Sequence, residues 1–253
     1  MIVDLEDAVA PERKVLAREG LAASFAALPE ADRRRLLVRI NASGTPWHDD
    51  DRTAVAALVA QGLIAGMVLP KAERAGDLRL PAEAIGAKGL LVPLIESAAG
   101  LAAVDELASA QQVLRLAFGN LDFQADVGLA CDADEAELVP VRLALLLATR
   151  RAGLSAPIDG VTADWRNTQR LAIDTARARR GGFGAKLCIY PDQVAPVHAA
   201  LGPTAQELAW ARRVVEAIRA AGGGVVSLDG RMVDAPVVRL AERLLALEDQ
   251  PAP

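Results

Sequence analysis

Aromatic, cysteine and histidine residues are scarce in this sequence of 253 residues. Aromatic residues make up 3% of the chain and hydrophobic residues 52%, so alanine and the aliphatic side chains must fill the core. The two cysteines, Cys131 and Cys188, stand in no metal-binding or redox motif and are too few for a disulfide framework. The two histidines, His48 and His198, lie outside the apolar runs, so a histidine general base is not favoured.

Long apolar runs and basic tracts are also absent. No stretch reaches the roughly 18 apolar residues of a membrane-spanning helix, and the N-terminus lacks the layout of a signal peptide. The formal net charge is −5 and the pI is about 5.2, without the basic patch of a nucleic-acid-binding surface. These absences predict a cytoplasmic protein that binds neither nucleic acid nor membrane.

What the sequence does contain is a repeated pattern of short apolar runs that end in polar residues. One run covers residues 90–95 and ends at Glu96. Runs of this length are typical of strands buried on both faces of a parallel sheet. Their ends lie about 25 to 37 residues apart, the size of one βα unit, with segments of helical spacing between them. The other runs cover residues 1–3, 36–38, 66–69, 113–118, 157–158 and 186–189.

This pattern predicts an α/β protein with a TIM-type (β/α)8 barrel, a fold of about 250 residues. Seven strand ends can be counted where a closed barrel needs eight, so we expect the first βα unit to be absent. After residue 191 the pattern changes to helices, a glycine run at 222–224 and a turn at 229–230. We therefore predict a barrel over residues 1–201 and a C-terminal helical extension over residues 202–253 that covers a site.

Two carboxylates end neighbouring strands of the predicted barrel. Glu96 and Asp122 should meet at the carboxyl ends of the strands, where barrel enzymes carry their chemistry. Mg²⁺ takes one or two carboxylates and completes its coordination with water and substrate oxygens. Arg39 ends another strand at the same mouth, and its guanidinium suits capture of a substrate carboxylate. The pattern predicts a magnesium site for an anionic substrate, or alternatively a set of buried salt bridges.

Other polar residues follow the predicted strands. Asp4 and Glu6 should share a face, where they take part in the chemistry or hold Arg39 or Lys71. Lys71 could form a Schiff base, although its acidic neighbours would keep the ammonium protonated. The acidic run at 49–51 either binds a cation or, as we expect, caps a helix and faces water.

Seven motifs occur in an order that resembles one family. They are VDLEDAV (3–9), VRIN (38–41), LPK (69–71), LIE (94–96), FGNLD (118–122), KLCIYPDQ (186–193) and GRMVDAP (230–236). The chain resembles the citrate lyase β-subunit-like proteins of the HpcH/HpaI aldolase group, whose relatives include malyl-CoA and citramalyl-CoA lyases. Such proteins usually have a further strand and helix before the first motif. Tyr190 stands where a histidine is common.

The resemblance implies roles for residues of these motifs. Glu96 and Asp122 would hold Mg²⁺, and Arg39 would bind the acid or thioester oxygen. Asp234 would be an acid/base residue delivered by the C-terminal segment of a neighbouring subunit, since these proteins commonly form trimers. The same position also suits an ordinary helix cap. Within the motifs, Glu6 and Lys71 are further catalytic candidates, and the further substrate-binding candidates are Asp4, Asn41 and Gly119.

The function that we expect is a Mg²⁺-dependent carbon–carbon lyase. Its substrate would be a 3-hydroxyacyl thioester, such as citryl-, malyl- or citramalyl-CoA, carried on CoA or on a carrier protein. The reverse condensation is equally compatible with the residues. Two alternatives remain open: a pyruvate-type aldolase that acts on a free acid, and a catalytically silent subunit that binds a CoA thioester.

Overall fold

The computed structural model describes residues 1–248, which form two compact units. Unit 1 consists of Met1–Asp164 and Arg177–Ile189, and unit 2, within the described residues, consists of Trp165–Ala176 and residues 190–248. Each unit is described separately below. The expected division of the chain at residues 201 and 202 stays a prediction.

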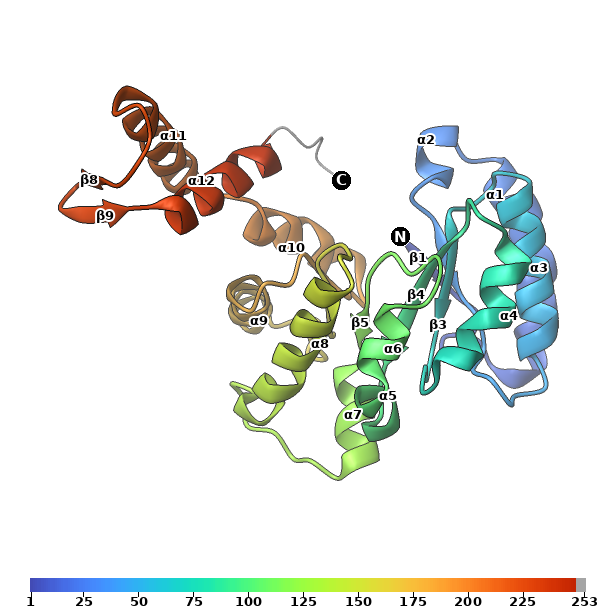
Figure 1. The fold of residues 1–253 in the computed structure, drawn as a ribbon. Coiled ribbons are helices and arrows are strands. Elements are labelled where there is room, and N and C mark those ends of the chain that lie inside the picture. Colours follow the sequence, from blue (N-terminus) through green and yellow to red (C-terminus); the bar gives the residue numbers. More distant parts are fainter. Residues whose placement is uncertain (249–253) are drawn as a thin grey trace. The chain divides into compact units, whose positions relative to one another are not determined.

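Unit 1 contains a curled parallel sheet in which the strands follow one another in chain order (Figure 1). Each strand pairs in parallel with the next, which confirms the predicted α/β fold of TIM type. The seven strands are β1 (Ile2–Asp4), β2 (Leu37–Arg39), β3 (Gly66–Leu69), β4 (Leu90–Ile95), β5 (Ala117–Phe118), β6 (Ile158–Asp159) and β7 (Ala185–Lys186).

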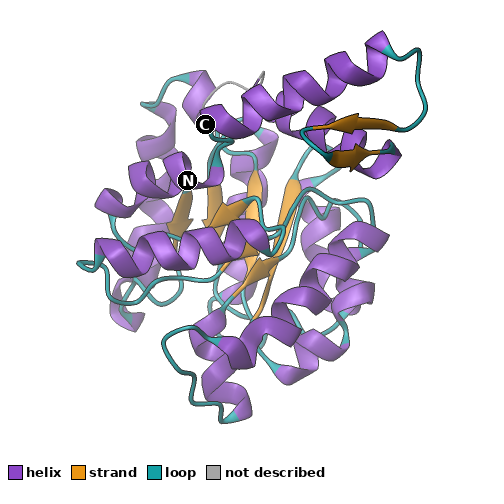
Figure 2. Cartoon of the chain, turned by 90° about the vertical axis from the view of Figure 1, so that its left-hand side faces the viewer, coloured by secondary structure: helices purple, strands orange, loops and turns teal. Residues whose placement is uncertain are grey.

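Helices connect the strands of unit 1 and pack beside the sheet, as Figure 2 shows with strands in orange and helices in purple. The α-helices are α1 (Lys14–Ala26), α2 (Glu30–Arg33), α3 (His48–Ala60), α4 (Ala75–Ile85), α5 (Ala98–Ala102), α6 (Val104–Ala108), α7 (Asn120–Val127) and α8 (Val139–Arg151). Two 3₁₀ turns, η1 (Pro11–Arg13) and η2 (Ala136–Leu138), precede α1 and α8. Helix α9 (Thr168–Arg180) begins in unit 2 and ends in unit 1.

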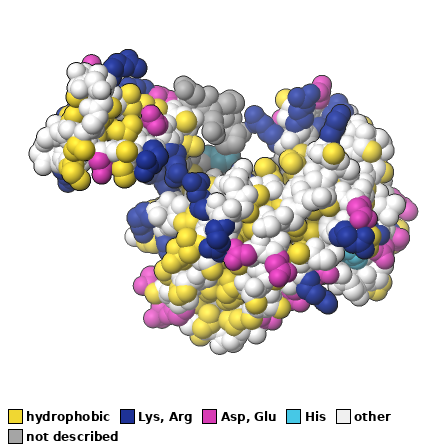
Figure 3. Space-filling view, in the orientation of Figure 1, with side chains coloured by type: hydrophobic (Ala, Val, Ile, Leu, Met, Phe, Trp, Pro, Cys, Tyr) yellow, Lys and Arg dark blue, Asp and Glu magenta, His cyan; other side chains and the backbone are white. Residues whose placement is uncertain are grey.

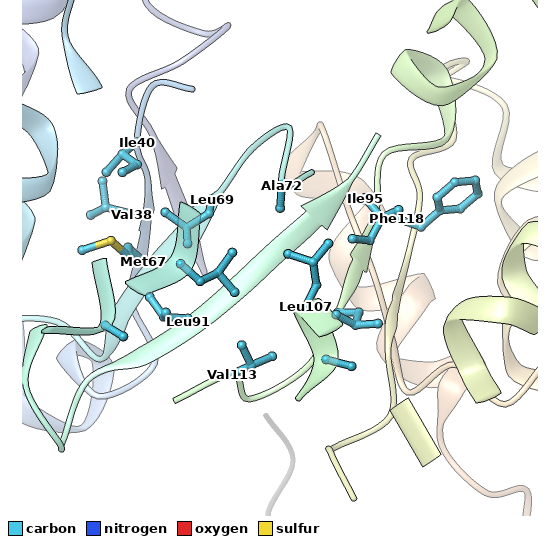
Figure 4. Packing of buried hydrophobic residues seen from close by; sticks show 14 of the residues in the cluster. Val38, Ile40, Met67, Leu69, Ala72, Leu91, Ile95, Leu107, Val113 and Phe118 are labelled. Atoms are coloured by element: carbon cyan, nitrogen blue, oxygen red, sulfur yellow. The ribbon is translucent and has the colours of Figure 1, made fainter. Parts of the chain in front are cut away.

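The two faces of the sheet carry different clusters because successive side chains of a strand point to opposite faces. The larger cluster packs the sheet against the helices, and Figure 4 shows part of it, with Val38, Met67, Leu91 and Phe118 labelled. The smaller cluster lies on the inner face and includes Val68, Val92, Leu94, Ala117 and Ile158. Aliphatic side chains thus dominate both clusters, as the composition requires.

The same alternation brings polar residues to the inner face at the carboxyl ends of the strands. Ile2 and Leu37 are register partners that pack on the inner cluster. Two residues later in each strand, Asp4 is the register partner of Arg39. These two polar side chains therefore continue the inner face where β1 and β2 end.

Unit 2 is built mainly from a helix pair with a short hairpin between its members. Thr204 and Glu207 form a reciprocal capping box that starts the first long helix. Val233 is 3% exposed because it packs between the two helices, whereas Met232 is 65% exposed. The elements are η3 (Pro191–Gln193), α10 (Val194–Leu201), α11 (Ala205–Ala220), β8 (Val226–Leu228), β9 (Arg231–Val233) and α12 (Ala235–Glu248).

Among residues 1–248, none of the helices combines the length and the apolar character needed to cross a bilayer. On the face of unit 1 drawn in Figure 3, basic and acidic side chains are interspersed rather than gathered by sign.

Candidate active site

The candidate site lies at the carboxyl ends of β1 to β5, where the inner face of the sheet turns polar. Its centre is Arg39, a half-buried guanidinium that contacts acidic side chains at the end of β1 and in the segment that follows. Arg39 Nε and Nη2 donate to the two oxygens of Asp4 at 2.8 and 2.6 Å. Nη1 lies 3.0 Å from Glu6 Oε2, and Nη2 lies 3.5 Å from Asp7 Oδ2. The paired geometry with Asp4 is the bidentate arrangement that arginine favours.

Burial and the contacts with Arg39 shift the pKa values of Asp4 and Glu6. Burial tends to raise the pKa of Asp4, but the hydrogen bonds and charge of Arg39 and two backbone N–H groups hold the pKa below its usual range. Burial raises the pKa of Glu6 to about 7. The charge of Arg39 opposes this rise, and the negative charges of Asp7 and Glu96 add to it. Glu6 can therefore hold or release a proton near neutral pH, whereas Asp4 stays ionised.

Glu96 follows β4 directly and is 4% exposed. Its Oε2 accepts a hydrogen bond from the backbone N–H of Lys71 at 2.8 Å. Burial raises the pKa of Glu96 to about 7; the Lys71 hydrogen bond opposes this rise, and the charge of Asp122 adds to it. Lys71 has φ of 49°, a left-handed conformation that is costly for a lysine. The turn after β3 thus places its N–H group toward the carboxylate at the expense of backbone strain.

Asp122 lies in the first turn of α7 rather than on β5 itself, and its side chain is exposed. Asn120, the first residue of that helix, is 1% exposed. Its side chain accepts from the N–H of Val161 at 2.9 Å and donates to the C=O of Val161 at 3.2 Å. The pair of bonds fixes the start of α7, and with it Asp122, to the segment that follows β6.

The residues present fit a magnesium ion. The charge of Asp122 contributes to the raised pKa of Glu96, a repulsion that a bound cation would relieve. Within the described residues, no group of three or more His, Cys, Asp or Glu side chains could enclose a metal ion. Two carboxylates with open positions are what Mg²⁺ uses when water and substrate supply the remaining oxygens. Zinc and copper, by contrast, favour sites with nitrogen or sulfur ligands.

Asn41, a substrate-binding candidate from the sequence, is 2% exposed and its amide is engaged within the protein. Its Nδ2 donates to the C=O of Leu5 at 3.0 Å and to Asp51 Oδ2 at 2.6 Å. Asp51 is fully buried and also pairs with Arg18 at 2.9 Å, so the expectation that the whole acidic run faces water is wrong for this residue. The geometry favours a supporting role for Asn41 behind the loop that carries Glu6.

Sequence reasoning missed a further supporting residue, Lys14. Its ammonium is buried and donates to the C=O of Leu5 at 2.9 Å and of Glu6 at 2.8 Å. The Nζ also lies 5.1 Å from the ring centroid of Trp47, within cation–π range. A lysine at the start of an amphipathic helix gives no sequence signal of such burial.

The remaining candidate residues divide between the two units. Gly119 lies beside Glu96 in unit 1, and the side chain of Lys71 is exposed there. Asp234 lies in unit 2, where its Oδ1 accepts from the N–H of Val237 at 3.3 Å at the start of α12. The helix-capping contact expected as one alternative is therefore present. The catalytic and binding roles of these residues stay predictions.

A TIM-type sheet whose inner face ends in an arginine and paired carboxylates defines a class of barrel proteins that can hold a divalent cation and an anionic ligand at the mouth. The comparisons with known proteins narrow the class. Residues 1–191 match the model of the HpcH/HpaI aldolase/citrate lyase family, and the chain belongs to that family. The resemblance inferred from the seven motifs is thereby confirmed.

Named relatives extend over nearly the whole chain. Citrate lyase subunit beta of Escherichia coli (strain K12) is 34% identical, over 97% of this chain and 84% of that protein. A (3S)-malyl-CoA thioesterase of Cereibacter sphaeroides (strain KD131) is 31% identical, over 97% and 85%. The crystal structure of CitE from Mycobacterium tuberculosis in complex with magnesium, acetoacetate and coenzyme A is 33% identical, with a TM-score of 0.83 over 98% of this chain and 89% of that one.

Proposed function

We propose that the protein is a Mg²⁺-dependent carbon–carbon lyase that cleaves a 3-hydroxyacyl thioester with a distal carboxylate, or makes it by the reverse condensation. The observation that carries the proposal is the cluster of Arg39, Glu96 and Asp122 at one end of the inner face. Support comes from the family, whose members include citrate lyase β subunits, and from a similar structure that contains magnesium and coenzyme A.

The reaction breaks the bond between C2 and C3 of the acyl chain. The C3 hydroxyl loses its proton and becomes the carbonyl of a 2-oxo acid, while the bonding electrons pass to C2 of the thioester enolate, which then takes up a proton. Glu96 and Asp122 would hold Mg²⁺, which supplies Lewis acidity to the oxygens of the 2-oxo acid. The chain must also place positive charge near the enolate oxygen and move the protons.

Arg39 supplies the fixed positive charge. Asp4 pairs with Nε and Nη2 of its guanidinium, and Glu6 contacts Nη1, so the group is oriented before substrate binds. Such preorganisation means that little reorganisation is needed when charge develops. Nη1 has one acidic partner, Glu6, and its second N–H group can donate to a thioester or carboxylate oxygen. The exposed ammonium of Lys71 adds positive charge at the same end of the sheet.

Proton transfer falls to a carboxyl group in this proposal. Asp234 is the candidate that the family resemblance supplies, delivered by the C-terminal segment of a neighbouring subunit in a trimer. Glu6 is the candidate within unit 1, because its pKa of about 7 allows both protonation states near neutral pH. The two candidates differ in that Glu6 also contacts Arg39 at 3.0 Å.

Thioester hydrolysis is a second candidate, favoured by the (3S)-malyl-CoA thioesterase relative at 31% identity. The two reactions have different products. Carbon–carbon cleavage releases a 2-oxo acid and leaves the thioester intact, whereas hydrolysis releases a free thiol and the hydroxy acid. One thioester substrate therefore distinguishes them.

The test is an assay of malyl-, citramalyl- and citryl-CoA with and without Mg²⁺, in which 2-oxo acid and free thiol are measured in parallel. The proposal expects 2-oxo acid without thiol, lost in EDTA and reduced at least about 100-fold by Glu96→Gln. Thiol without 2-oxo acid would favour the thioesterase. The free acids malate, citramalate and citrate are assayed in parallel, and cleavage of these alone would favour an aldolase. Calorimetric binding of a thioester without turnover would favour a silent subunit.

A further inference from the structure

Helix α7 carries Asp122, and its last turn carries Asp126, a residue to which the proposed chemistry gives no role. Asp126 Oδ2 accepts a hydrogen bond from the backbone N–H of Ala98 at 2.8 Å. Ala98 is the first residue of α5 and lies two residues after Glu96. Helices α5 and α7 lie side by side (Figure 1). One hydrogen bond thus joins the helix of Asp122 to the segment that carries Glu96.

Within its own helix, Asp126 is unfavourably placed. It lies in the last turn of α7, where the helix dipole disfavours a negative charge. It also lies four residues after Asp122, and like charges at this spacing repel each other. By contrast, the N–H of Ala98 belongs to the first turn of α5, where a donor finds no acceptor inside the helix. The bond to Ala98, rather than the stability of α7, therefore accounts for an aspartate at position 126.

The segment that donates this bond is itself fixed from the side of β3. Glu96 accepts from the backbone N–H of Lys71 at 2.8 Å. The next residue, Ser97, is 6% exposed and donates from its Oγ to Glu73 Oε1 at 2.8 Å. The same Oγ caps the start of α5. Residues 96–98 therefore form a fixed reference against which α7 can be placed.

Helix α7 is held at two points. At its start, the side chain of Asn120 pairs with the backbone of Val161 at 2.9 and 3.2 Å. Asp126 lies six residues later, about 9 Å along the helix axis. A short helix that is fixed at one end can still pivot, whereas a second anchor sets the direction of its axis. Asp122 lies between the anchors and, at a spacing of four residues, on the same face as Asp126, so the second anchor directs Asp122 toward the side of Glu96.

We propose that Asp126 is a positioning residue that sets the spacing between Glu96 and Asp122, and thereby the fit of the two carboxylates to Mg²⁺. It acts through the N–H of Ala98 and touches neither the ion nor the substrate. The role rests on the proposed function, in which the two carboxylates hold the metal. Without the bond, α7 can pivot about Asn120, and Mg²⁺ tolerates little departure from its preferred geometry.

Calorimetric titration with Mg²⁺ tests the role with two variants of one residue. Asp126→Ala removes the acceptor and should weaken Mg²⁺ binding about tenfold, as changes to groups that orient metal ligands do. Asp126→Asn removes the same charge but keeps an oxygen that can accept from Ala98, so most of the affinity should remain. Asp132→Ala is the control for charge and should leave the affinity unchanged. The Asp132 side chain is exposed in the loop after α7 and, among residues 1–248, makes neither a hydrogen bond nor an ion pair.

Two measurements in EDTA separate positioning from a general loss of stability. The Ala98 amide should exchange its hydrogen slowly in the parent protein and in Asp126→Asn, and faster in Asp126→Ala, because Asp126 is its acceptor. Exchange is followed by NMR spectroscopy. The melting temperature of Asp126→Ala should lie within about 4 °C of the parent value, since a single exposed hydrogen bond contributes little to stability.

The outcomes distinguish this role from the proposed function. Unchanged Mg²⁺ affinity in Asp126→Ala, with weaker binding in Glu96→Gln, would overturn the positioning role and keep the metal site. Equal losses in Asp126→Ala and Asp126→Asn would show that the charge acts rather than the hydrogen bond, and would overturn the role as well. A parent protein that binds no Mg²⁺ would reject the metal site together with the role. Mg²⁺ affinity that depends on the Asp126 acceptor in a protein without lyase activity would keep the role and reject only the reaction.

Discussion

Gly119 lies against the side chain of Glu96 so closely that a Cβ at position 119 would be 2.4 Å from Glu96 Cγ and 2.7 Å from Oε1. Atoms do not approach so closely, and the buried carboxylate has little room to move, since Lys71 holds its other oxygen. The backbone at Gly119 has φ of −92°, which any residue can adopt. Glycine is therefore required here for space beside the carboxylate and not for backbone conformation.

The first prediction follows from this contact. Gly119→Ala should displace the Glu96 carboxylate and reduce Mg²⁺ affinity by roughly 10- to 100-fold, as changes to groups that orient a metal ligand do. Calorimetric titration with Mg²⁺ measures the effect. Gly20→Ala in α1 is the matched control, because nothing lies within 4 Å of its added Cβ. Equal Mg²⁺ affinity in both variants would contradict the assignment of Glu96 as a ligand.

Glu96→Gln should separate metal binding from folding. The amide keeps an acceptor for the N–H of Lys71 but removes a charge whose burial raises the pKa of Glu96 to about 7. In EDTA at pH 8 we expect the variant to melt at least roughly 3 °C above the parent protein. With Mg²⁺ the order should reverse, since only the parent gains stability from the ion. A variant that still gains the parent's full Mg²⁺-dependent shift would rule out this site.

The pH dependence of stability should reflect Glu6 and Glu96. The folded protein keeps protons on both groups up to their pKa of about 7, whereas the unfolded chain releases them near 4.5. The folded state thus binds more protons between these values. Their contribution is fully present below about pH 4.5 and is lost as the pH rises through 7. Urea unfolding in EDTA should show stability falling across this window, and a Glu6→Gln, Glu96→Gln double variant should flatten the slope.

Asp4 should contribute to the pH dependence of stability with the opposite sign and at lower pH. The pKa of Asp4 lies below its ordinary 3.8, because the contacts with Arg39 outweigh the effect of burial. Its contribution is present above that value and is lost as the pH falls through the lowered pKa. Asp4→Asn should therefore destabilise the protein at neutral pH and lose this effect in strong acid. A constant difference from pH 7 to pH 2 would contradict the Arg39 pairing.

The sequence was sufficient to predict the fold and the strand ends. Each strand of a parallel barrel is short, apolar and followed by polar residues, so the ends at Arg39 and Glu96 could be located from the pattern alone. The period of two along a strand also predicts that Asp4 and Glu6 share a face, and both contact Arg39. These features depend on neighbours along the chain, which a single sequence reveals.

Contacts between distant segments were not predictable in the same way. Asp51 is separated from Arg18 by 33 residues, and nothing in the run of three aspartates distinguishes the buried member. Asn120 meets Val161 across 41 residues. Asp122 was expected at a strand end, but β5 stops at Phe118 and α7 begins two residues later. Such contacts require the curvature and register of the sheet.

Asp51 therefore gives a stability prediction that the sequence could not. Asp51→Ala leaves the half-buried Arg18 without its buried partner and frees the amide of Asn41, so the free energy of unfolding should fall by about 3–5 kcal/mol. Asp49→Ala is the control, because that side chain is 81% exposed and should cost at most about 1 kcal/mol. Urea unfolding measures both. Similar small losses would show that the Asp51 pairing does not support the fold.

The last prediction concerns Asp234, which caps α12 and is the proposed acid/base residue from a neighbouring subunit. Asparagine caps helices about as well as aspartate, whereas alanine does not. Asp234→Asn should therefore keep the melting temperature, since the Val237 N–H retains its acceptor, and should still lower kcat at least about 100-fold by removing the proton-transfer group. Asp234→Ala should lose roughly 1 kcal/mol of stability as well. Full activity in Asp234→Asn would leave only the capping role.

Mixed oligomers then decide whether the site is shared. Asp234→Asn and Glu96→Gln chains are each expected to be inactive, because the first lacks the proton-transfer group and the second lacks a Mg²⁺ ligand. If Asp234 of one subunit serves the Glu96 site of another, then co-assembled chains contain some sites in which both residues are native. Part of the parent activity should return on mixing and rise with the fraction of mixed oligomers, measured by mass spectrometry of intact assemblies. Asp234→Asn mixed with Asp234→Ala is the control that cannot recover. Verified mixed oligomers without activity would place Asp234 in the site of its own subunit or outside the chemistry.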